Sequence, residues 1–378
     1  MFRVKTFLCK FPLTVIMLPL SPSAPLGLFY KCCRRFVFER EKTSEMQETI
    51  RYLLGRAGAS GFGSKSTAED VTKTSADLHN ITAIITGATS GIGEETARVL
   101  AMRGVRLVLP ARNLKAAQET KSRIAGELPE SEIIVLPLDL SSLSSVQSFV
   151  SSFLGLHLPL NLLINNAGKF SRNFELSEDG IEMTFATNYL GHFLLTKLLI
   201  EKMVETASTT GIEGRIVNVS SGIYTWFSGD GLRYLDLVTR KKIVYDATRT
   251  YALSKLANLL HTIELAEKLE EMGANVIANC VHPGIVRTRL TRDREGFLTD
   301  LAFAMASKLL KTIPQAAATT CYVAVHPAVA GVTGKYFVDC NEASPSEEVV
   351  SMKEAARFWS ASEEMTMENM SKEKDKAM

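Results

Sequence analysis

The sequence has few cysteines, and their spacing does not suit a metal. No Cys-x-x-Cys pair and no Cys/His ligand spacing occurs, so we expect no metal site. Three of the cysteines lie in apolar stretches of the body, which predicts buried thiols in a reducing compartment. The six cysteines among 378 residues are Cys9, Cys32, Cys33, Cys280, Cys321 and Cys340.

The body of the chain also lacks an excess of either charge. Residues 1–45 hold eight of the 43 Lys and Arg residues but three of the 41 Asp and Glu residues, which leaves 35 basic against 38 acidic residues in the body. A body with this balance does not attract a polyanion, so we expect no nucleic-acid partner.

Acidic residues are missing from 1–38, where six basic residues occur. Residues 11–30 carry no charge and are long enough to span a bilayer, but four prolines interrupt them. Three interpretations of 1–45 stay open: a targeting segment, a membrane anchor, or a spurious extension upstream of a start at Met46. The change of charge pattern near Met46 slightly favours the last.

Apolar runs of four to eight residues alternate with amphipathic stretches from residue 80 onward. This order predicts the α/β class, with a single doubly wound Rossmann domain over 80–341 and a seven-stranded, mostly parallel sheet covered by helices on both faces. Residues 46–79 are expected to form a flexible lead-in, and 342–378 a short helix near 355–363 followed by a polar tail. The expected strands are "ITAIIT", "VRLVLP", "EIIVLPL", "LNLLIN", "GRIVNVS", "NVIANCV" and "GKYFVD", and the expected helices lie near 91–103, 113–128, 142–155, 178–206, 247–272 and 314–326.

The stretch "TGATSGIG" at 86–93 follows the first apolar run and precedes a helical pattern. A helix start offers unpaired N–H groups and the positive end of the helix dipole. Without side chains at Gly87, Gly91 and Gly93, a pyrophosphate can approach that start closely. The position between strand and helix therefore predicts a dinucleotide site, although the spacing is G-x-x-x-G-x-G.

An acid is missing at the end of the second expected strand, where enzymes that use NAD usually bind the ribose hydroxyls. Arg112 stands there instead, in "VLPARN". A guanidinium can form paired hydrogen bonds to a 2′-phosphate, so we expect NADP rather than NAD.

Polar side chains follow the fourth and fifth expected strands, in "NNAG" and "SSG", and Tyr251 and Lys255 lie four residues apart on the next helix. Carboxyl ends of parallel strands meet at one edge, so these groups are expected to gather beside a nicotinamide. An ordinary tyrosine titrates near pH 10, and a neighbouring ammonium stabilises the phenolate. Tyr251 can then act as general acid or base while Ser221 holds the substrate oxygen.

These motifs, in this order, resemble those of the short-chain dehydrogenase/reductase family over residues 80–340. The matching stretches are TGxxxGIG (86–93), Asp139 after the third strand, NNAG (165–168), "ATNYLGHF" around Asn188, Ser221, YxxxK (251–255) and Pro283-Gly284. The resemblance implies a catalytic tetrad of Asn188, Ser221, Tyr251 and Lys255, with Asn188 placing a water behind Lys255. The implied NADP-binding residues are Gly87, Thr89, Ser90, Gly91, Ile92, Gly93, Arg112, Asn113, Asp139, Leu140, Asn165, Ala167, Gly168, Tyr251, Lys255, Pro283, Gly284, Val286 and Thr288.

Within the family, "NYLGHFLLT", "SKLANLLHT" and "HPGIVRT" are similar to the retinol-dehydrogenase-like branch, and the lead-in "GASGFGSKSTAEDVT" resembles its plant chloroplast-envelope, translocon-associated members. This resemblance implies NADPH dependence and leaves chloroplast (including its envelope), cytoplasm and peripheral membrane contact open. The long helices at 178–206 and 247–272 could also pair in a homodimer.

The substrate side is rich in apolar residues. Between Ser221 and Tyr251 lie Tyr224, Trp226, Phe227 and Tyr234, and 295–311 is apolar at roughly helical spacing. These residues are expected either to pack in the core, or to cover a lipophilic carbonyl or alcohol substrate, or to form a membrane-surface helix. Two functions follow: an NADPH-dependent oxidoreductase acting on such a molecule, or an NADP(H)-binding sensor or scaffold in a membrane-associated complex.

Overall fold

One mixed sheet organises the part of the chain that the structure, a computed structural model, describes: residues 51–75, 78–286, 310–346 and 348–377, with side chains up to residue 367. Within these residues eight strands form the sheet in the order β3-β2-β1-β4-β5-β6-β7-β8. The strands are β1 (Thr82–Ile85), β2 (Arg106–Ala111), β3 (Ile133–Pro137), β4 (Leu162–Asn165), β5 (Gly214–Val219), β6 (Val276–His282), β7 (Tyr336–Val338) and β8 (Asn341–Ala343).

The first seven strands are parallel, as expected from their continuous apolar runs. In β1, for example, Ile84 pairs with Val108 of β2 on one side and with Leu163 of β4 on the other. All four residues of β1 are buried, because helices cover both faces of the sheet. The predicted fold class is therefore confirmed.

The eighth strand was not predicted. β8 pairs antiparallel with β7 through a two-residue turn at Asp339 and Cys340, whose φ angles are +52° and +63°. Such a turn needs positive φ at both central residues and is usually marked by Asn-Gly or Asp-Gly. Asp-Cys carries no such signal, so nothing in the residue pattern predicted a turn and a further strand after "GKYFVD".

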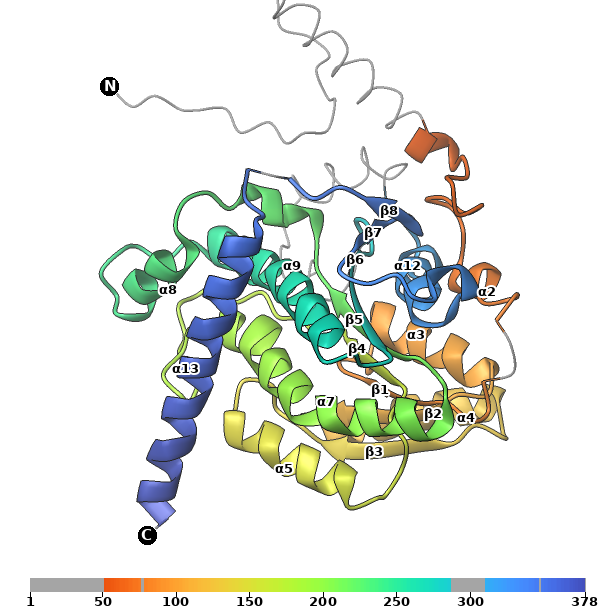
Figure 1. Cartoon of the computed structure of the whole chain (residues 1–378), viewed down its shortest axis with the longest axis horizontal. Coiled ribbons are helices and arrows are strands. Elements are labelled where there is room, and N and C mark those ends of the chain that lie inside the picture. The colour runs from red at the N-terminus through yellow and green to blue at the C-terminus, as the bar shows by residue number, and fades with distance from the viewer. Residues whose placement is uncertain (1–50, 76–77, 287–309, 347, 378) are drawn as a thin grey trace, which may run out of the picture.

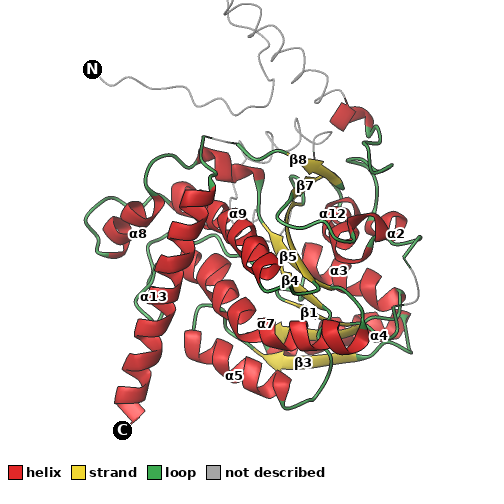
Figure 2. Ribbon diagram, in the orientation of Figure 1, coloured by secondary structure: helices red, strands yellow, loops and turns green. Residues whose placement is uncertain are grey.

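Helices form a layer on each face of the sheet (Figures 1 and 2). Side chains of α3, α4 and α12 pack in the core on one face, and those of α5, α7 and α9 pack in the core on the other. The helices are α2 (Ala68–Val71), α3 (Gly91–Met102), α4 (Leu114–Glu127), α5 (Leu143–Leu154), α6 (Met183–Phe185), the π-helical turn η1 (Ala186–Leu190), α7 (Gly191–Thr210), the 3₁₀ turn η2 (Gly222–Trp226), α8 (Gly231–Thr239), α9 (Ala247–Glu271), α12 (Ile313–Val325), the 3₁₀ turn η4 (Pro327–Val329) and α13 (Met352–Ala377).

The expected flexible lead-in is packed where the structure describes it. Ala68 and Val71 of α2 are fully buried, and α2 lies against α3 and α12. Further upstream, the Asn341 side chain accepts a hydrogen bond from the Ser60 N–H and donates one to the Phe62 carbonyl. The polar composition of this segment concealed these contacts, because an isolated asparagine supplies them from the far end of the chain.

The C-terminal segment also differs from its prediction. Instead of a short helix and a polar tail, α13 is one helix that runs along the side of the molecule (Figure 1). Ala355 and Phe358 are buried, and the Tyr189 and Ser362 hydroxyls are 2.7 Å apart. α13 thus covers part of α9, one of the two helices expected to contact a second copy.

Several expectations lie outside the described residues. They concern the nature of 1–45, the apolar run from 295 to 309, and Thr288. Among the described helices, none has the length and hydropathy required to cross a bilayer.

Candidate active site

The glycine loop joins β1 to α3 at the carboxyl edge of the sheet. Gly87 and Gly91 have φ angles of +67° and +61°, a conformation that suits glycine. A Cβ on Gly93 would lie 2.4 Å from the carbonyl oxygen of Gly87, so this position has no room for a side chain. The backbone at Gly93 thus packs directly against the backbone at Gly87, and the loop presents backbone atoms to the site.

The first turn of α3 is left open. Ser90 is a residue type that commonly caps helices, yet its side chain forms no cap hydrogen bond here. Side chains do cap α2, α4, α5, α8, α9 and α12. The N–H groups that follow Ser90, next to the glycines, can donate hydrogen bonds to an anionic group such as a pyrophosphate.

Asn166 braces the glycine loop, a role the sequence did not reveal. Its amide nitrogen donates to the carbonyl oxygens of Thr86 (2.9 Å) and Gly87 (3.3 Å). The Thr86 hydroxyl in turn accepts the N–H groups of Asn166 and Ala167. The loop and the end of β4 are therefore one hydrogen-bonded unit.

Asn165, one of the expected NADP-binding residues, directs its side chain into the interior of the protein. Its side chain is buried, and its amide donates to Thr196 (3.0 Å) and Asn218 (2.8 Å). These partners lie in the interior of the protein, so the Asn165 side chain does too. Alternate residues along a strand point to opposite faces, so the next residue need not follow it. Asn165 thus joins β4 to β5 and α7, and of the two asparagines Asn166 lies at the loop.

Arg112 and Asp139, both expected to bind NADP, lie just after β2 and β3. Arg112 is 70% exposed, and its guanidinium is 3.9 Å from the Asp139 carboxylate. Asp139 is held by the N–H and hydroxyl of Ser141, while Leu140 is buried. Asn113, also expected to bind NADP, caps α4 with its side chain through the Ala116 N–H.

The two serines after β5 have different environments. Ser220 is buried, and its hydroxyl donates to the Lys255 carbonyl at 2.7 Å. Ser221 is half-buried, and its hydroxyl accepts a long bond of 3.4 Å from the Ile223 N–H. Ser221 can therefore bind a substrate oxygen, whereas Ser220 holds α9 against the sheet.

Lys255 and Asn188 approach Gly168 from different elements. A Cβ on Gly168 would lie 3.8 Å from both the Lys255 Nζ and the Asn188 Oδ1. Lys255 is almost fully buried and donates to the Val219 carbonyl at 2.9 Å. Desolvation lowers the pKa of Lys255 from 10.5 to about 8. The ammonium also lies 5.8 Å from the centre of the Tyr251 ring.

Asn188 lies in the π-helical turn η1, a local irregularity common at functional sites. Its side chain accepts the Lys169 N–H at 2.6 Å and donates to the Lys169 carbonyl at 2.9 Å. Its main-chain carbonyl is 3.1 Å from His192 Nδ1, and His192 Nε2 is 2.9 Å from the Thr86 hydroxyl. Burial lowers the pKa of His192 to about 4, so a neutral imidazole links η1 to the glycine loop.

The turn after β6 borders the site next to the end of β7. Gly284 has φ of +91°, and a Cβ there would lie 2.7 Å from the Lys311 side chain. Lys311 is buried and pairs with Asp339 at 2.5 Å. Pro283 and Val286 are also buried. Lys311 was not singled out in the sequence, because no local pattern links it to Gly284.

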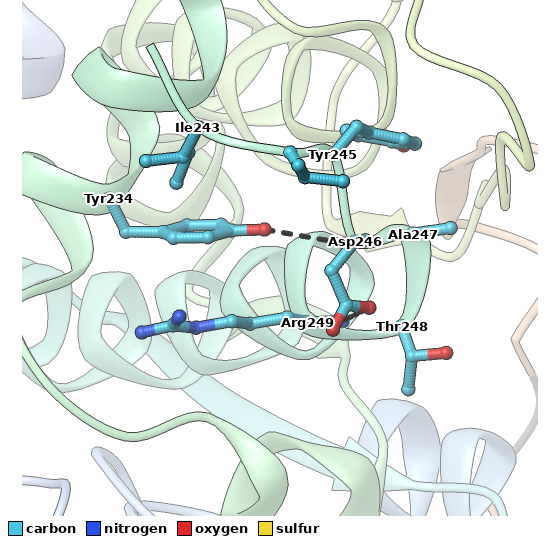
Figure 3. A pocket seen from close by; sticks show the side chains of 8 residues that line it. Tyr234, Ile243, Tyr245, Asp246, Ala247, Thr248 and Arg249 are labelled. Carbon is cyan, nitrogen blue, oxygen red and sulfur yellow. Dashed lines mark hydrogen bonds between the residues drawn. The ribbon is translucent and has the colours of Figure 1, made fainter. Parts of the chain in front are cut away.

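Most of the aromatic residues between Ser221 and Tyr251 pack in the core. Tyr224, Phe227 and Tyr234 are 4%, 1% and 4% exposed, whereas Trp226 is 45% exposed. A groove of about 630 Å³ lies at the start of α9, lined by Tyr234 and residues 243–249 (Figure 3). Within it Val244 is 92% exposed. No cluster of three or more potential metal ligands occurs among the described side chains.

Comparison with known proteins agrees with this geometry. A family model described as short chain dehydrogenase matches residues 81–226. The short-chain dehydrogenase TIC 32 B, chloroplastic, of Brassica napus is 52% identical over 312 residues, which cover 82% of this chain and 96% of that protein. Human retinol dehydrogenase 14 is 39% identical over 303 residues, covering 76% of this chain and 87% of that protein.

A solved structure shares the fold. L-Sorbose reductase from Gluconobacter frateurii, complexed with NADPH and L-sorbose, matches with a TM-score of 0.55 and 20% identity, covering 69% of this chain and 96% of that one. The resemblance inferred from the motifs is thus confirmed by relatives that match over most of their length. The chain belongs to the short-chain dehydrogenase family.

Proposed function

We propose that the protein is an NADPH-dependent oxidoreductase that interconverts a carbonyl and an alcohol on a lipophilic small molecule, with Tyr251 as general acid and base. The observation that carries this proposal is the gathering of Lys255 and Asn188 against Gly168, at the same sheet edge as Ser221 and the open start of α3. Each group comes from a different element, and together they supply what carbonyl reduction requires.

The described residues suit a dinucleotide. The open N–H groups of α3 can donate hydrogen bonds to a pyrophosphate, and the exposed Arg112 can bind a 2′-phosphate at the neighbouring strand end. When bound, the nicotinamide supplies or accepts a hydride. The expectation of NADP over NAD depends on Arg112 and on the absence of an acid at that strand end.

Side chains of the protein would donate and accept the proton that the reaction requires. In the reduction, Ser221 holds the carbonyl oxygen, and Tyr251 donates its phenolic proton to the developing alkoxide. In the oxidation, the phenolate takes that proton from the alcohol. Lys255 stabilises the phenolate through its positive charge, and its pKa of about 8 leaves it mostly protonated at pH 7. Asn188 would hold a water from which Tyr251 is reprotonated.

The experiment measures binding and turnover separately on the full chain. NADPH and NADH are titrated by fluorescence, and NADPH oxidation is followed with aliphatic aldehydes of increasing chain length. We expect NADPH to bind more tightly, and turnover to increase with chain length. In Tyr251→Phe, NADPH should still bind while turnover falls by about 10²–10⁴-fold. NADPH binding without turnover of any aldehyde would favour the sensor or scaffold alternative.

The relatives also suggest where the protein acts. Two proteins of Brassica napus at 52% and 51% identity carry the description chloroplastic. We therefore place this protein in the chloroplast, with residues 1–45 as the segment to test for targeting. A reporter fused to the full chain should enter the chloroplast, and a diffuse cytosolic signal would contradict this placement.

A further inference from the structure

Phe170 packs against Tyr251, and the residues on both sides of Phe170 are held in place. The Phe170 and Tyr251 rings meet edge to face, with centroids 5.6 Å apart. The backbone of Lys169 is held by the two Asn188 hydrogen bonds. Ser171 donates its N–H to the Thr184 hydroxyl at 3.3 Å. The surface that Tyr251 contacts is therefore fixed by backbone contacts to its two neighbours.

Tyr245 supplies a further contact to Ser171. Its hydroxyl lies 2.9 Å from the Ser171 carbonyl and 3.0 Å from a Glu182 carboxylate oxygen. Both of these atoms are acceptors, so the phenolic proton is shared between them. Burial, and then the Glu182 charge, raise the pKa of Tyr245 above its usual 10, so the hydroxyl stays a donor at neutral pH.

Glu182 connects this contact to the turn that carries Asn188. The carboxylate is fully buried and accepts the N–H groups of Thr184 (3.0 Å) and Phe185 (2.8 Å). It thereby caps α6, which continues directly into η1. A buried carboxylate is stable only with enough donors, and the Tyr245 hydroxyl is its third.

Tyr245 also lies at the start of α9. It directly precedes Asp246, whose side chain caps α9 through the Arg249 N–H, and Tyr251 follows within the next turns. One side chain thus connects the start of the Tyr251 helix, the Phe170 segment and the Asn188 turn. These are the three backbone segments that determine where Tyr251 and Asn188 lie relative to each other.

We propose that Tyr245, bonded to Glu182 and Ser171, is a positioning residue that aligns Tyr251 with Asn188 through Phe170 and the α6–η1 turn. This inference rests on the proposed function. If the Tyr251 phenol is displaced by a fraction of an ångström, the protein still binds cofactor and substrate, but proton transfer from the phenol becomes slower. Loss of the Tyr245 hydroxyl should therefore reduce kcat without changing NADPH affinity.

Tyr234 offers a matched control from the same groove (Figure 3). Its hydroxyl bonds to the Thr250 hydroxyl at 3.0 Å and to the Asp246 carbonyl at 3.3 Å, so it also holds the start of α9. Its ring lies against the Arg249 guanidinium. Neither of these hydroxyl partners belongs to the Phe170 segment or to α6. Tyr234→Phe therefore removes a comparable bond without disturbing the connection to Asn188.

The test compares Tyr245→Phe, Tyr234→Phe and the wild type as full chains. For Tyr245→Phe we expect kcat to fall by about 10–100-fold. NADPH affinity should stay within about twofold, and the kinetic isotope effect with deuterated NADPH should change as proton transfer becomes slower. In the cofactor-free protein, amide exchange of 168–173 should accelerate. Tyr234→Phe should lower the unfolding midpoint with little change in kcat or in exchange of that segment.

Each outcome decides the proposal. Unchanged kcat in Tyr245→Phe, or an equal loss in Tyr234→Phe, would overturn the positioning role while the wild-type turnover left the proposed function intact. Absence of wild-type turnover would overturn both. If Tyr245→Phe does not fold, Phe170→Leu decides: a fall in kcat with NADPH binding retained supports the connection, and unchanged kcat overturns it.

Discussion

The glycine loop and the Tyr251–Lys255 face of α9 meet the same sheet edge, but they are built differently. In the loop, backbone N–H groups form the surface, and glycines leave them accessible. On α9, side chains form the surface, and Lys255 is buried with its charge desolvated. The first region depends on glycine conformation and on the Asn166 bonds to the loop backbone, whereas the second depends on buried side chains from several elements.

Among the variants that test this comparison, the largest effect should come from the paired serines, whose side chains belong to the second kind of region. Ser221→Ala removes the hydroxyl that we propose holds the substrate oxygen, and kcat should fall by about 10²–10³-fold. Ser220→Ala removes the buried bond to the Lys255 carbonyl and should mainly cost about 1–2 kcal/mol of stability. Steady-state kinetics and chemical unfolding of both variants check this. A greater kcat loss in Ser220→Ala would reverse the assignment of the two serines.

A methyl group added to the glycine loop tests whether backbone N–H groups form the cofactor-binding surface. Gly93→Ala places a Cβ 2.4 Å from the Gly87 carbonyl oxygen, so the loop must move and NADPH affinity should fall by about 100-fold. Gly126→Ala in α4 is the control, because a Cβ there meets nothing within 4 Å. Fluorescence titration measures both. Equal NADPH affinity in the two variants would show that the loop does not form the binding surface.

Lys255 should reduce stability at neutral pH. Lowering its pKa from 10.5 to about 8 corresponds to about 3 kcal/mol of desolvation. The bond to Val219 contributes about 1 kcal/mol, so Lys255→Met should be more stable than wild type by about 2 kcal/mol at pH 7.

The same substitution has a pH signature. Between pH 8 and 10.5 the unfolded chain holds a proton on Lys255 that the folded protein has lost, so this residue makes stability rise with pH. The advantage of Lys255→Met should therefore shrink across that window. Urea unfolding of both proteins at pH 7 and pH 10 measures it. A constant difference between the two would contradict the lowered pKa.

The smallest effect on cofactor binding is expected for Arg112, whose side chain lies next to the glycine loop region. Arg112 is exposed, so Arg112→Ser should leave stability unchanged and weaken NADPH binding by about 10-fold while NADH binding changes little. Titration with both cofactors measures the ratio. An equal loss for NADPH and NADH would contradict the 2′-phosphate contact.

Neighbouring residues of the same type show how far the sequence could predict the site. The order of strands, helices and motifs identified the sheet edge and the Tyr251–Lys255 pair, since these depend on spacing along the chain. The sequence did not distinguish Asn165 from Asn166, because both stand at the end of β4. Asn165 bonds to residues 31 and 53 positions away, and Asn166 bonds to residues 79 and 80 positions away.

By itself the sequence determined the alternation of strands and helices, the glycine loop and the family motifs, because each follows from local periodicity or from residues close in the chain. Only the tertiary structure decided the β7–β8 hairpin, the length and docking of α13, and the contact of Tyr245 with Glu182 and Ser171. Those features depend on which distant donors and acceptors become buried together. Burial makes an unpaired polar group costly, and no local pattern of residues reveals which partner will meet it.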